Sequence, residues 1–232
     1  MIKLVAFDFD GTLVDSNFGK EDCVHKVIAP IEGAMAVLEQ ARAVGGNRYT
    51  LFREIAARVK PGRGADEILH HSRSMTSSYT RCCELAICGA PERRDARKTL
   101  LGLKARGIHI VVNTGTPAPD LPVLLRRRGL MRLVDGYFGS PVPKADNLRR
   151  AMRDLHVTPS ETIVVGDGPD DMECARETGA WFVAITAEQR IKTKVRFAMR
   201  DLSKLVALVD RMNKGRIGAR SRSALRAQRA AE

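Results

Sequence analysis

The sequence predicts an α/β protein, in which a parallel sheet carries helices on both faces and a helical cap domain is inserted after the first strand. Short apolar runs alternate with helical segments, which is typical of parallel sheets. The long stretch after the first strand has helical periodicity and no strand pattern. We therefore expect a core of residues 1–16 and 91–212, a cap of residues 17–90, and a basic, disordered tail of residues 213–232.

The core elements follow one another in chain order. An apolar run predicts the first strand over residues 2–8, and a second strand over 108–112 follows a helix within 92–106. Glycine is common just after a helix end, and Gly107 stands at that position. The remaining expected elements are helices over 121–128 and 145–155, a strand over 160–165, a helix over 170–178 and a strand over 181–185.

The inserted segment is expected to contain several helices. Glycine pairs and Pro-Gly sequences interrupt helices, and such breakers occur at Gly45-Gly46 and at Pro61-Gly62-Arg63-Gly64. The insertion leaves the end of the first strand, so we expect it to cover whatever site forms there. Arg63 lies in a glycine-rich turn, and its planar guanidinium suits an anionic substrate.

Composition limits the function classes. Of the 232 residues, 44% are hydrophobic, which is enough for a core and unlike a disordered chain. No apolar run reaches the roughly 18 residues of a membrane span, and the N-terminus lacks a secretory signal pattern. We expect a cytoplasmic protein without a membrane partner, whose five cysteines are reduced thiols because their spacing matches no zinc site: Cys23, Cys82, Cys83, Cys88 and Cys174.

The charge is strongly positive, at +12, and residues 213–232 contribute +5 of it. Such a segment could touch nucleic acid electrostatically, but it contains no aromatic residue for base stacking. We expect a small anionic metabolite as the partner, with at most weak nucleic-acid contact through the tail. The sequence indicates no oligomeric state.

The most informative motif is Asp8-Phe9-Asp10-Gly11-Thr12, which follows the first strand. Ligands of open α/β sheets bind outside the carboxyl ends of strands, and two nearby carboxylates repel each other unless a cation lies between them. A calcium loop is the alternative, but it needs Gly at its sixth and Glu at its twelfth position. Those positions hold Leu13 and Gly19, which argues against it.

Three further segments place polar residues beside strand or helix ends. Thr114 and Gly115 follow the second strand, where a hydroxyl and an open backbone can approach an anion. Lys144 precedes a helix, where the helix dipole does not favour a cation. Three carboxylates follow the strand that ends at Val165, namely Asp167, Asp170 and Asp171. Like charges this close repel one another, so a contribution to stability does not explain why they occur together.

Taken together, these motifs resemble the haloacid dehalogenase superfamily of hydrolases, in particular capped phosphatases of the phosphoglycolate phosphatase and β-phosphoglucomutase type. The resemblance implies a Rossmann-like core and a Mg²⁺-dependent phosphomonoesterase. It implies that Asp8 is the nucleophile that forms an aspartyl-phosphate and that Asp10 is the acid/base. It also implies that Thr114, Gly115 and Lys144 bind the phosphate. The metal ligands that it implies are Asp8, Asp10, Asp167 and Asp171. The role of Asp170 stays unassigned.

Two alternatives stay open. A phosphosugar mutase would need an acid/base group in the cap, and the early cap lacks the histidine of those relatives, with His25 at a different offset. A non-catalytic regulatory or binding protein could keep the fold, but the complete set of motif residues argues against it. Asp10 also argues against the halide-removing and phosphonate-cleaving relatives.

Overall fold

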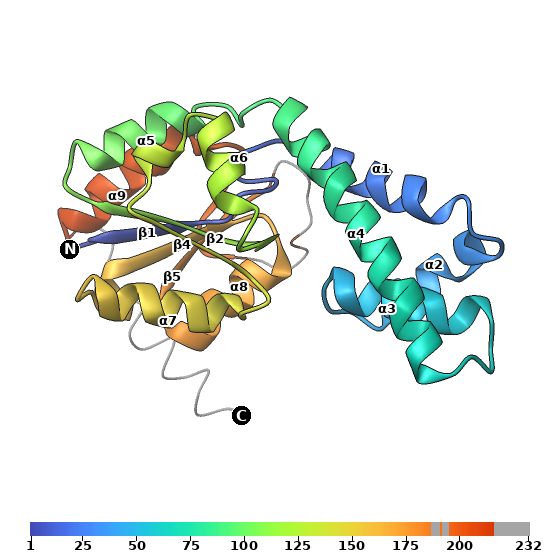
Figure 1. The fold of residues 1–232 in the computed structure, drawn as a ribbon. Coiled ribbons are helices and arrows are strands. Elements are labelled where there is room, and N and C mark those ends of the chain that lie inside the picture. Colours follow the sequence, from blue (N-terminus) through green and yellow to red (C-terminus); the bar gives the residue numbers. More distant parts are fainter. Residues whose placement is uncertain (187–190, 192–194, 216–232) are drawn as a thin grey trace. The chain divides into compact units, whose positions relative to one another are not determined.

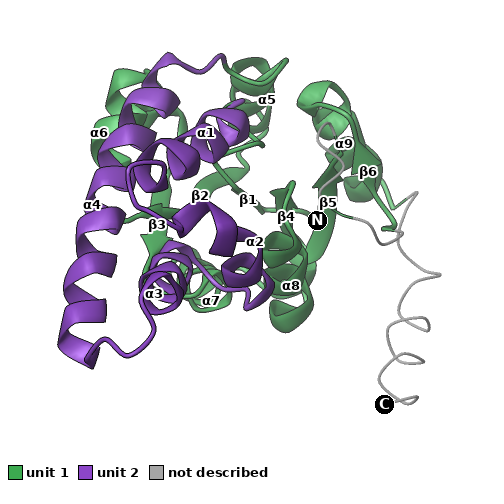
Figure 2. Ribbon diagram, turned by 90° about the vertical axis from the view of Figure 1, so that its right-hand side faces the viewer, with its two compact units in different colours: residues 1–14, 92–232 green, residues 15–91 purple. Residues whose placement is uncertain are grey.

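The protein is described here by a computed structural model, which covers residues 1–186, 191 and 195–215. The chain forms two compact units (Figure 2), unit 1 with residues 1–14 and 92–232 and unit 2 with residues 15–91. Unit 1 contains the sheet, and the regular elements of unit 2 are helices.

Unit 1 is built on a six-stranded parallel sheet with the strand order β3-β2-β1-β4-β5-β6. The predicted Rossmann-like α/β class is confirmed. The first strand is almost fully apolar because it is buried on both faces in the middle of the sheet. The strands are β1 (Leu4–Phe7), β2 (His109–Pro117), β3 (Gly136–Ser140), β4 (Thr162–Gly166), β5 (Trp181–Ile185) and β6 (Ala198–Met199).

Helices cover both faces of this sheet (Figure 1). One face carries α5 (Ala96–Lys104), α6 (Leu121–Arg127) and α9 (Leu205–Asn213), and the other carries α7 (Lys144–Asp154) and α8 (Pro169–Thr178). Short 3₁₀ helices occur at Met131–Leu133, Pro159–Glu161 and Leu202–Lys204. Beneath α7 and α8, a buried cluster joins strands to helices and contains, among others, Leu4, Ala6, Val111, Leu148, Ala151 and Cys174.

The register of β1 determines where the site forms. Phe7 pairs with Val112 of β2 on one side and with Val165 of β4 on the other. The residues that follow these three therefore leave the sheet at one edge. Parallel strands with this order bring together side chains that are more than 100 residues apart in sequence.

The sequence analysis did not predict β3, β6 or α9. Strand β3 has glycines at both ends of its apolar part, which hides the strand pattern. A Cβ atom on Gly139 would come within 2.4 Å of the Thr116 carbonyl oxygen, so this glycine permits close backbone packing beside β2. Strand β6 has only two residues and gives no periodicity to detect.

Unit 2 consists of α1 (Asn17–Ile28), α2 (Ala34–Ala43), α3 (Arg48–Val59) and α4 (Ala65–Gly89). The long helix α4 packs against α1 and α3. The predicted breakers lie between α2 and α3 and between α3 and α4. Inside the unit, the rings of Phe52 and Tyr79 pack edge to face, with their centroids 5.3 Å apart.

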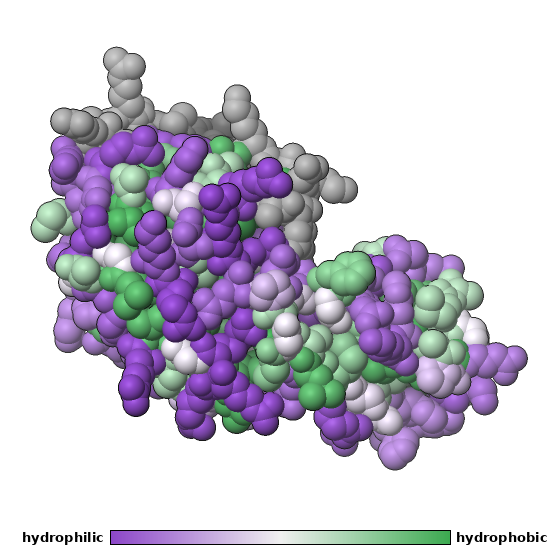
Figure 3. All heavy atoms as spheres, turned by 90° about the horizontal axis from the view of Figure 1, so that it is seen from above, coloured by the Kyte–Doolittle hydropathy of each residue, from purple (hydrophilic) through white to green (hydrophobic). Residues whose placement is uncertain are grey.

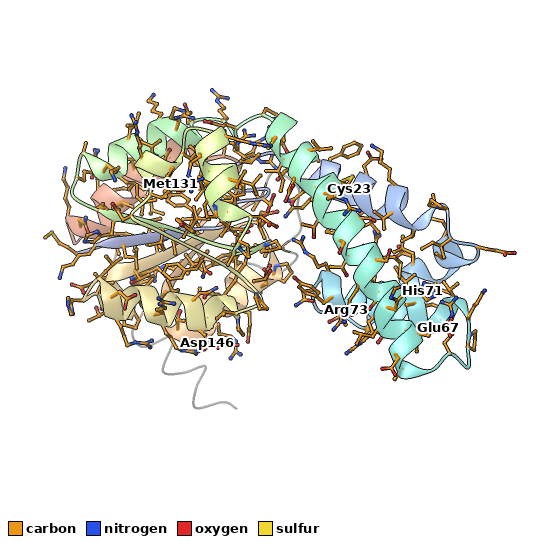
Figure 4. The ribbon with its side chains drawn as sticks, in the orientation of Figure 1. Cys23, Glu67, His71, Arg73, Met131 and Asp146 are labelled. Atoms are coloured by element: carbon orange, nitrogen blue, oxygen red, sulfur yellow. A yellow bond between two sulfur atoms is a disulfide. The ribbon has the colours of Figure 1, made fainter. Side chains whose placement is uncertain are left out.

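The expectation that all five cysteines are reduced is wrong. Cys23 of α1 and Cys82 of α4 form a disulfide, and Figure 4 shows Cys23 beside α4. The two residues are 59 positions apart, so only the packing of α1 on α4 reveals the pair. Cys83, Cys88 and Cys174 are outside disulfides, and burial raises the pKa of Cys174 to about 12, which keeps it a thiol.

The two segments that connect the units are paired with each other. Val14 forms an antiparallel bridge with Glu92, and the Arg93 amide donates to the Leu13 carbonyl at 2.9 Å. One step further, the Asp15 amide donates to the Pro91 carbonyl at 2.9 Å. Residues 15–91 therefore begin and end beside each other.

The end of α9 belongs to the core. Asn213 is its last residue, and its Oδ1 accepts a hydrogen bond from the Ile2 amide at 2.5 Å. Residues 216–232 of the predicted tail lie outside the described residues.

Figure 3 shows that the upper face of unit 1 is mostly hydrophilic, with hydrophobic residues scattered among the polar ones. Among the exposed hydrophobic residues of the unit 1 helices are Leu101 of α5 and Val123 of α6. Among the helices that the structure describes, none combines the length and the apolarity needed to cross a membrane.

Candidate active site

Three carboxylates meet at the carboxyl edge of the sheet. Asp8 follows β1, Asp167 follows β4, and Asp171 lies in the first turn of α8. All three are buried, and one oxygen of each lies within 4.8 Å of an oxygen of the others. Three buried carboxylates this close repel one another unless a proton or a cation lies among them.

Lys144 supplies one such cation. It is the first residue of α7, and its Nζ lies 3.1 Å from Asp8 Oδ1 and 2.6 Å from Asp171 Oδ1. A third carboxylate, Oδ2 of Asp170, lies 2.8 Å from the same nitrogen. The strand ends and the starts of α7 and α8 thus meet at one ammonium group.

Burial and neighbouring charges shift the pKa values of Asp8 and Lys144. Burial raises the pKa of Asp8 to about 6, while the Lys144 ammonium opposes this rise and the Asp167 carboxylate adds to it. Burial alone would lower the pKa of Lys144, but the carboxylates of Asp171, Asp8 and Asp170 hold it well above its ordinary value. Lys144 therefore stays charged at neutral pH.

Asp10 has a different environment. The Thr116 hydroxyl donates to Asp10 Oδ2 at 2.8 Å, and both side chains are buried. Asp10 is not in the group of three carboxylates whose oxygens lie within 4.8 Å of one another. The charge of Asp10 is nevertheless among those that raise the pKa of Asp8. Nearby, the Thr12 hydroxyl lies 3.4 Å from Asp167 Oδ1.

Thr114 and Gly115 lie inside β2, which extends to Pro117, whereas the sequence analysis ended this strand at residue 112 and placed them after it. Thr114 is buried, and its hydroxyl oxygen accepts a hydrogen bond from the Thr116 amide at 3.2 Å. Gly115 is exposed. Both residues follow the register position that pairs β2 with the end of β1.

Arg63 belongs to unit 2, whereas the carboxylates at the sheet edge and Lys144 belong to unit 1. Its Nε lies 2.7 Å from Glu67 Oε1, one helical turn further along, and its side chain is 14% exposed. Figure 4 labels Glu67 near the start of α4.

The sequence analysis missed two buried asparagines that hydrogen-bond to the backbone of Lys144 and of the segment before it. Asn113 Nδ2 donates to the Lys144 carbonyl at 2.8 Å. Asn147 Nδ2 donates to the carbonyls of Gly139 and Val142 at 3.3 and 3.2 Å. The available signal for Asn113 was a polar residue directly after the apolar run of β2. Asn147 stands in a helix rich in polar residues and gave no signal.

Comparison with known proteins identifies the family. The family model described as "Hydrolase: haloacid dehalogenase-like hydrolase" matches residues 2–179. A phosphoglycolate phosphatase of Rhodospirillum rubrum is 30% identical over 196 residues, covering 80% of each chain. One from Vibrio cholerae is 27% identical, covering 80% of this chain and 84% of the relative.

Solved structures agree on the fold. The crystal structure of a predicted phosphoglycolate phosphatase from Haemophilus somnus superposes with a TM-score of 0.71 and 19% identity, covering 90% of this chain and 98% of that one. The family match extends over both units and over every motif residue from Asp8 to Asp171. The chain therefore belongs to the haloacid dehalogenase-like hydrolases.

Proposed function

We propose that the protein is a Mg²⁺-dependent phosphomonoesterase that hydrolyses a small phosphorylated metabolite through an aspartyl-phosphate on Asp8. The observation that carries this proposal is the position of Asp8 at the end of the central strand, with the Lys144 ammonium 3.1 Å away. The carboxylates of Asp167 and Asp171 stand beside it. In this proposal, these neighbouring residues supply the nucleophile, the cation for a phosphoryl group and the oxygen ligands.

The donor set fits Mg²⁺. Oxygen atoms of Asp8, Asp167 and Asp171 lie within 4.8 Å of one another, and Mg²⁺ prefers a few carboxylates together with waters and phosphate oxygens. We propose that these three residues hold the ion, with Asp10 contributing through its backbone carbonyl. When bound, Mg²⁺ would offset the charge of the transferring phosphoryl group.

The chain's own residues can perform the two steps. One carboxylate oxygen of Asp8 attacks phosphorus, and the bond from phosphorus to the ester oxygen breaks. Asp10, in its protonated form, gives the departing alkoxide its proton. Asp10 then takes a proton from the water that attacks the phosphoryl group, and Asp8 is released together with inorganic phosphate.

Substrate binding is divided between the units in this proposal. The Thr114 hydroxyl, the Gly115 amide and the Lys144 ammonium would hold phosphoryl oxygens. Residues 15–91 would act as the cap that excludes water during the attack and reopens for product release. Arg63 would bind the rest of an anionic substrate in exchange for its ion pair with Glu67.

Phosphoglycolate is the first substrate to test, because the relatives from Rhodospirillum rubrum and Vibrio cholerae carry the name phosphoglycolate phosphatase. No contact among the described residues favours mutase chemistry. A cytoplasmic location stays a prediction from the sequence.

The decisive experiment is Asp8→Asn, assayed on an aryl phosphate and on phosphoglycolate with Mg²⁺. The variant keeps the shape of the side chain but loses the attacking charge, so turnover should fall by several orders of magnitude. Borohydride reduction during turnover should convert Asp8 of the wild type to homoserine, a mass change absent from the variant. A correctly folded Asp8→Asn protein with full activity would refute the proposal.

A further inference from the structure

Lys144 has as many acidic partners as it has donors. Its ammonium group carries three N–H bonds, and three carboxylates surround it. Asp171, Asp170 and Asp8 lie 2.6, 2.8 and 3.1 Å from Nζ. A phosphate oxygen that approaches Lys144 must therefore replace or share one of these three acceptors.

The three partners differ in burial. The side chains of Asp8 and Asp171 are 8% and 1% exposed, whereas that of Asp170 is 61% exposed. A buried carboxylate that loses its cation stays unpaired in a poorly solvated place, which is costly. The Asp170 carboxylate can return to water instead, so it is the partner that Lys144 gives up most easily.

The backbone before α8 permits this contact. Gly168 precedes Pro169 and has no side chain, and a Cβ atom there would lie 2.4 Å from Asp170 Oδ1. The Gly168 backbone is extended, with φ −104°, so its conformation does not require glycine. The space that glycine leaves is filled by the carboxylate that reaches Lys144.

We propose that Asp170 acts as an internal competitor of the substrate, holding one donor of Lys144 until a phosphate oxygen takes its place. This inference rests on the proposed function, since it concerns phosphate binding at the same site. Asp170 is a positioning residue in this view: it acts through Lys144 and sets the affinity for the phosphoryl group. Its charge also opposes the arrival of a dianion.

The test compares Asp170→Asn with the wild type at saturating Mg²⁺. The probes are inorganic phosphate, as a competitive inhibitor, and an aryl phosphate, as substrate. Removing one partly exposed ion pair should lower the phosphate inhibition constant and KM by roughly two- to fivefold. A gain in affinity is a readout that structural damage does not produce.

Asp146→Asn is the matched control. Asp146 lies in the first turn of α7, is 58% exposed, and pairs with Arg149 at 2.8 Å instead of with Lys144. Figure 4 shows Asp146 on the outer side of α7. This variant should keep the wild-type inhibition constant and KM.

An unchanged or weaker affinity for inorganic phosphate in Asp170→Asn would overturn the inference, as would a wild-type enzyme that phosphate does not inhibit. These outcomes are separate from failure of the proposed function. That failure would appear as undiminished turnover in Asp8→Asn, whatever the phosphate affinity of the Asp170 variant.

Discussion

The hydroxyl of Thr116 donates a hydrogen bond to Oδ2 of Asp10 at 2.8 Å, across 106 positions of the chain. Thr116 belongs to β2 and Asp10 to the turn after β1, so the pairing of these two strands creates the contact. Because both side chains are buried, the bond orients the carboxyl group proposed to deliver the proton to the leaving group.

Removing this bond should affect substrates unequally. We expect Thr116→Val to lower kcat by roughly tenfold on an alkyl phosphate, since a lost hydrogen bond to a charged group is worth about 1.5 kcal/mol or more. Aryl phosphates need less protonation and should slow less. Thr116→Ser restores the hydroxyl and should recover most of the rate. Steady-state kinetics on both substrates test this, and equal slowing of the two would exclude an effect through Asp10.

Asp167→Ala should weaken Mg²⁺ binding, because it removes one of the three clustered carboxylates. The wild type should lose activity after chelation and recover it on addition of Mg²⁺. The variant should need a higher Mg²⁺ concentration for half-maximal activity. Calorimetric titration with Mg²⁺ measures binding without turnover. Wild-type activity that survives exhaustive chelation would contradict the metal assignment.

The Cys23–Cys82 disulfide should stabilise unit 2. Closing a loop across 59 positions restricts the unfolded chain, which is worth about 2–4 kcal/mol in typical proteins. We expect a reductant to lower the melting temperature of the wild type and to leave Cys23→Ser/Cys82→Ser unaffected. Cys88→Ser is the control, since Cys88 is outside the disulfide and should respond to reductant like the wild type. A wild-type melting temperature that ignores reductant would contradict this expectation.

The boundary between core and tail can be located by two variants. A chain ending at Gly215 should keep the wild-type melting temperature and turnover, because it retains all of α9. Asn213→Ala should lower the free energy of unfolding by about 1 kcal/mol, since the Ile2 amide loses its acceptor. Thermal unfolding measures both. Loss of folding in the chain ending at Gly215 would show that residues 216–232 are needed by the core.

Arg63→Ala tests the proposed substrate contact of unit 2. With phosphoglycolate we expect a higher KM, because the carboxylate end of this substrate loses a planar cationic partner. A small aryl phosphate should be affected less. Arg81→Ala is the control in the same unit, since Arg81 is exposed and donates a hydrogen bond to the Ser78 hydroxyl at 3.4 Å. Equal kinetics of wild type and Arg63→Ala on phosphoglycolate would mean that Arg63 does not bind the substrate and only pairs with Glu67 at the turn before α4.

Much of the fold could be predicted because local patterns and topology agree. Buried strands such as β1 and β5 are continuous apolar runs, and glycines stand at helix ends such as Gly179. Parallel pairing then brings Asp8 and Asp167 to one edge without further information. Strand β3 escaped prediction because its glycines interrupt the pattern, and close packing on Thr116 explains one of them.

The site residues that the sequence did not indicate were missed for a different reason. Asn113, Asn147 and Thr116 act through side-chain hydrogen bonds to groups between 5 and 106 positions away, and nothing in their local sequence indicates these partners. The same holds for the Cys23–Cys82 disulfide, which depends on how α1 crosses α4. Contacts that depend on tertiary packing are invisible to periodicity and motif spacing.

The pairing of Val14 with Glu92 has a consequence for how this protein can change. To the sheet, residues 15–91 are equivalent to the loop of a hairpin, because both ends leave from one closed bridge. Loop closure depends only weakly on loop length, so lengthening, shortening or exchanging this segment should cost the sheet little. New substrate ranges could then arise by replacing one stretch of chain, while the strands that hold Asp8 and Lys144 keep their register.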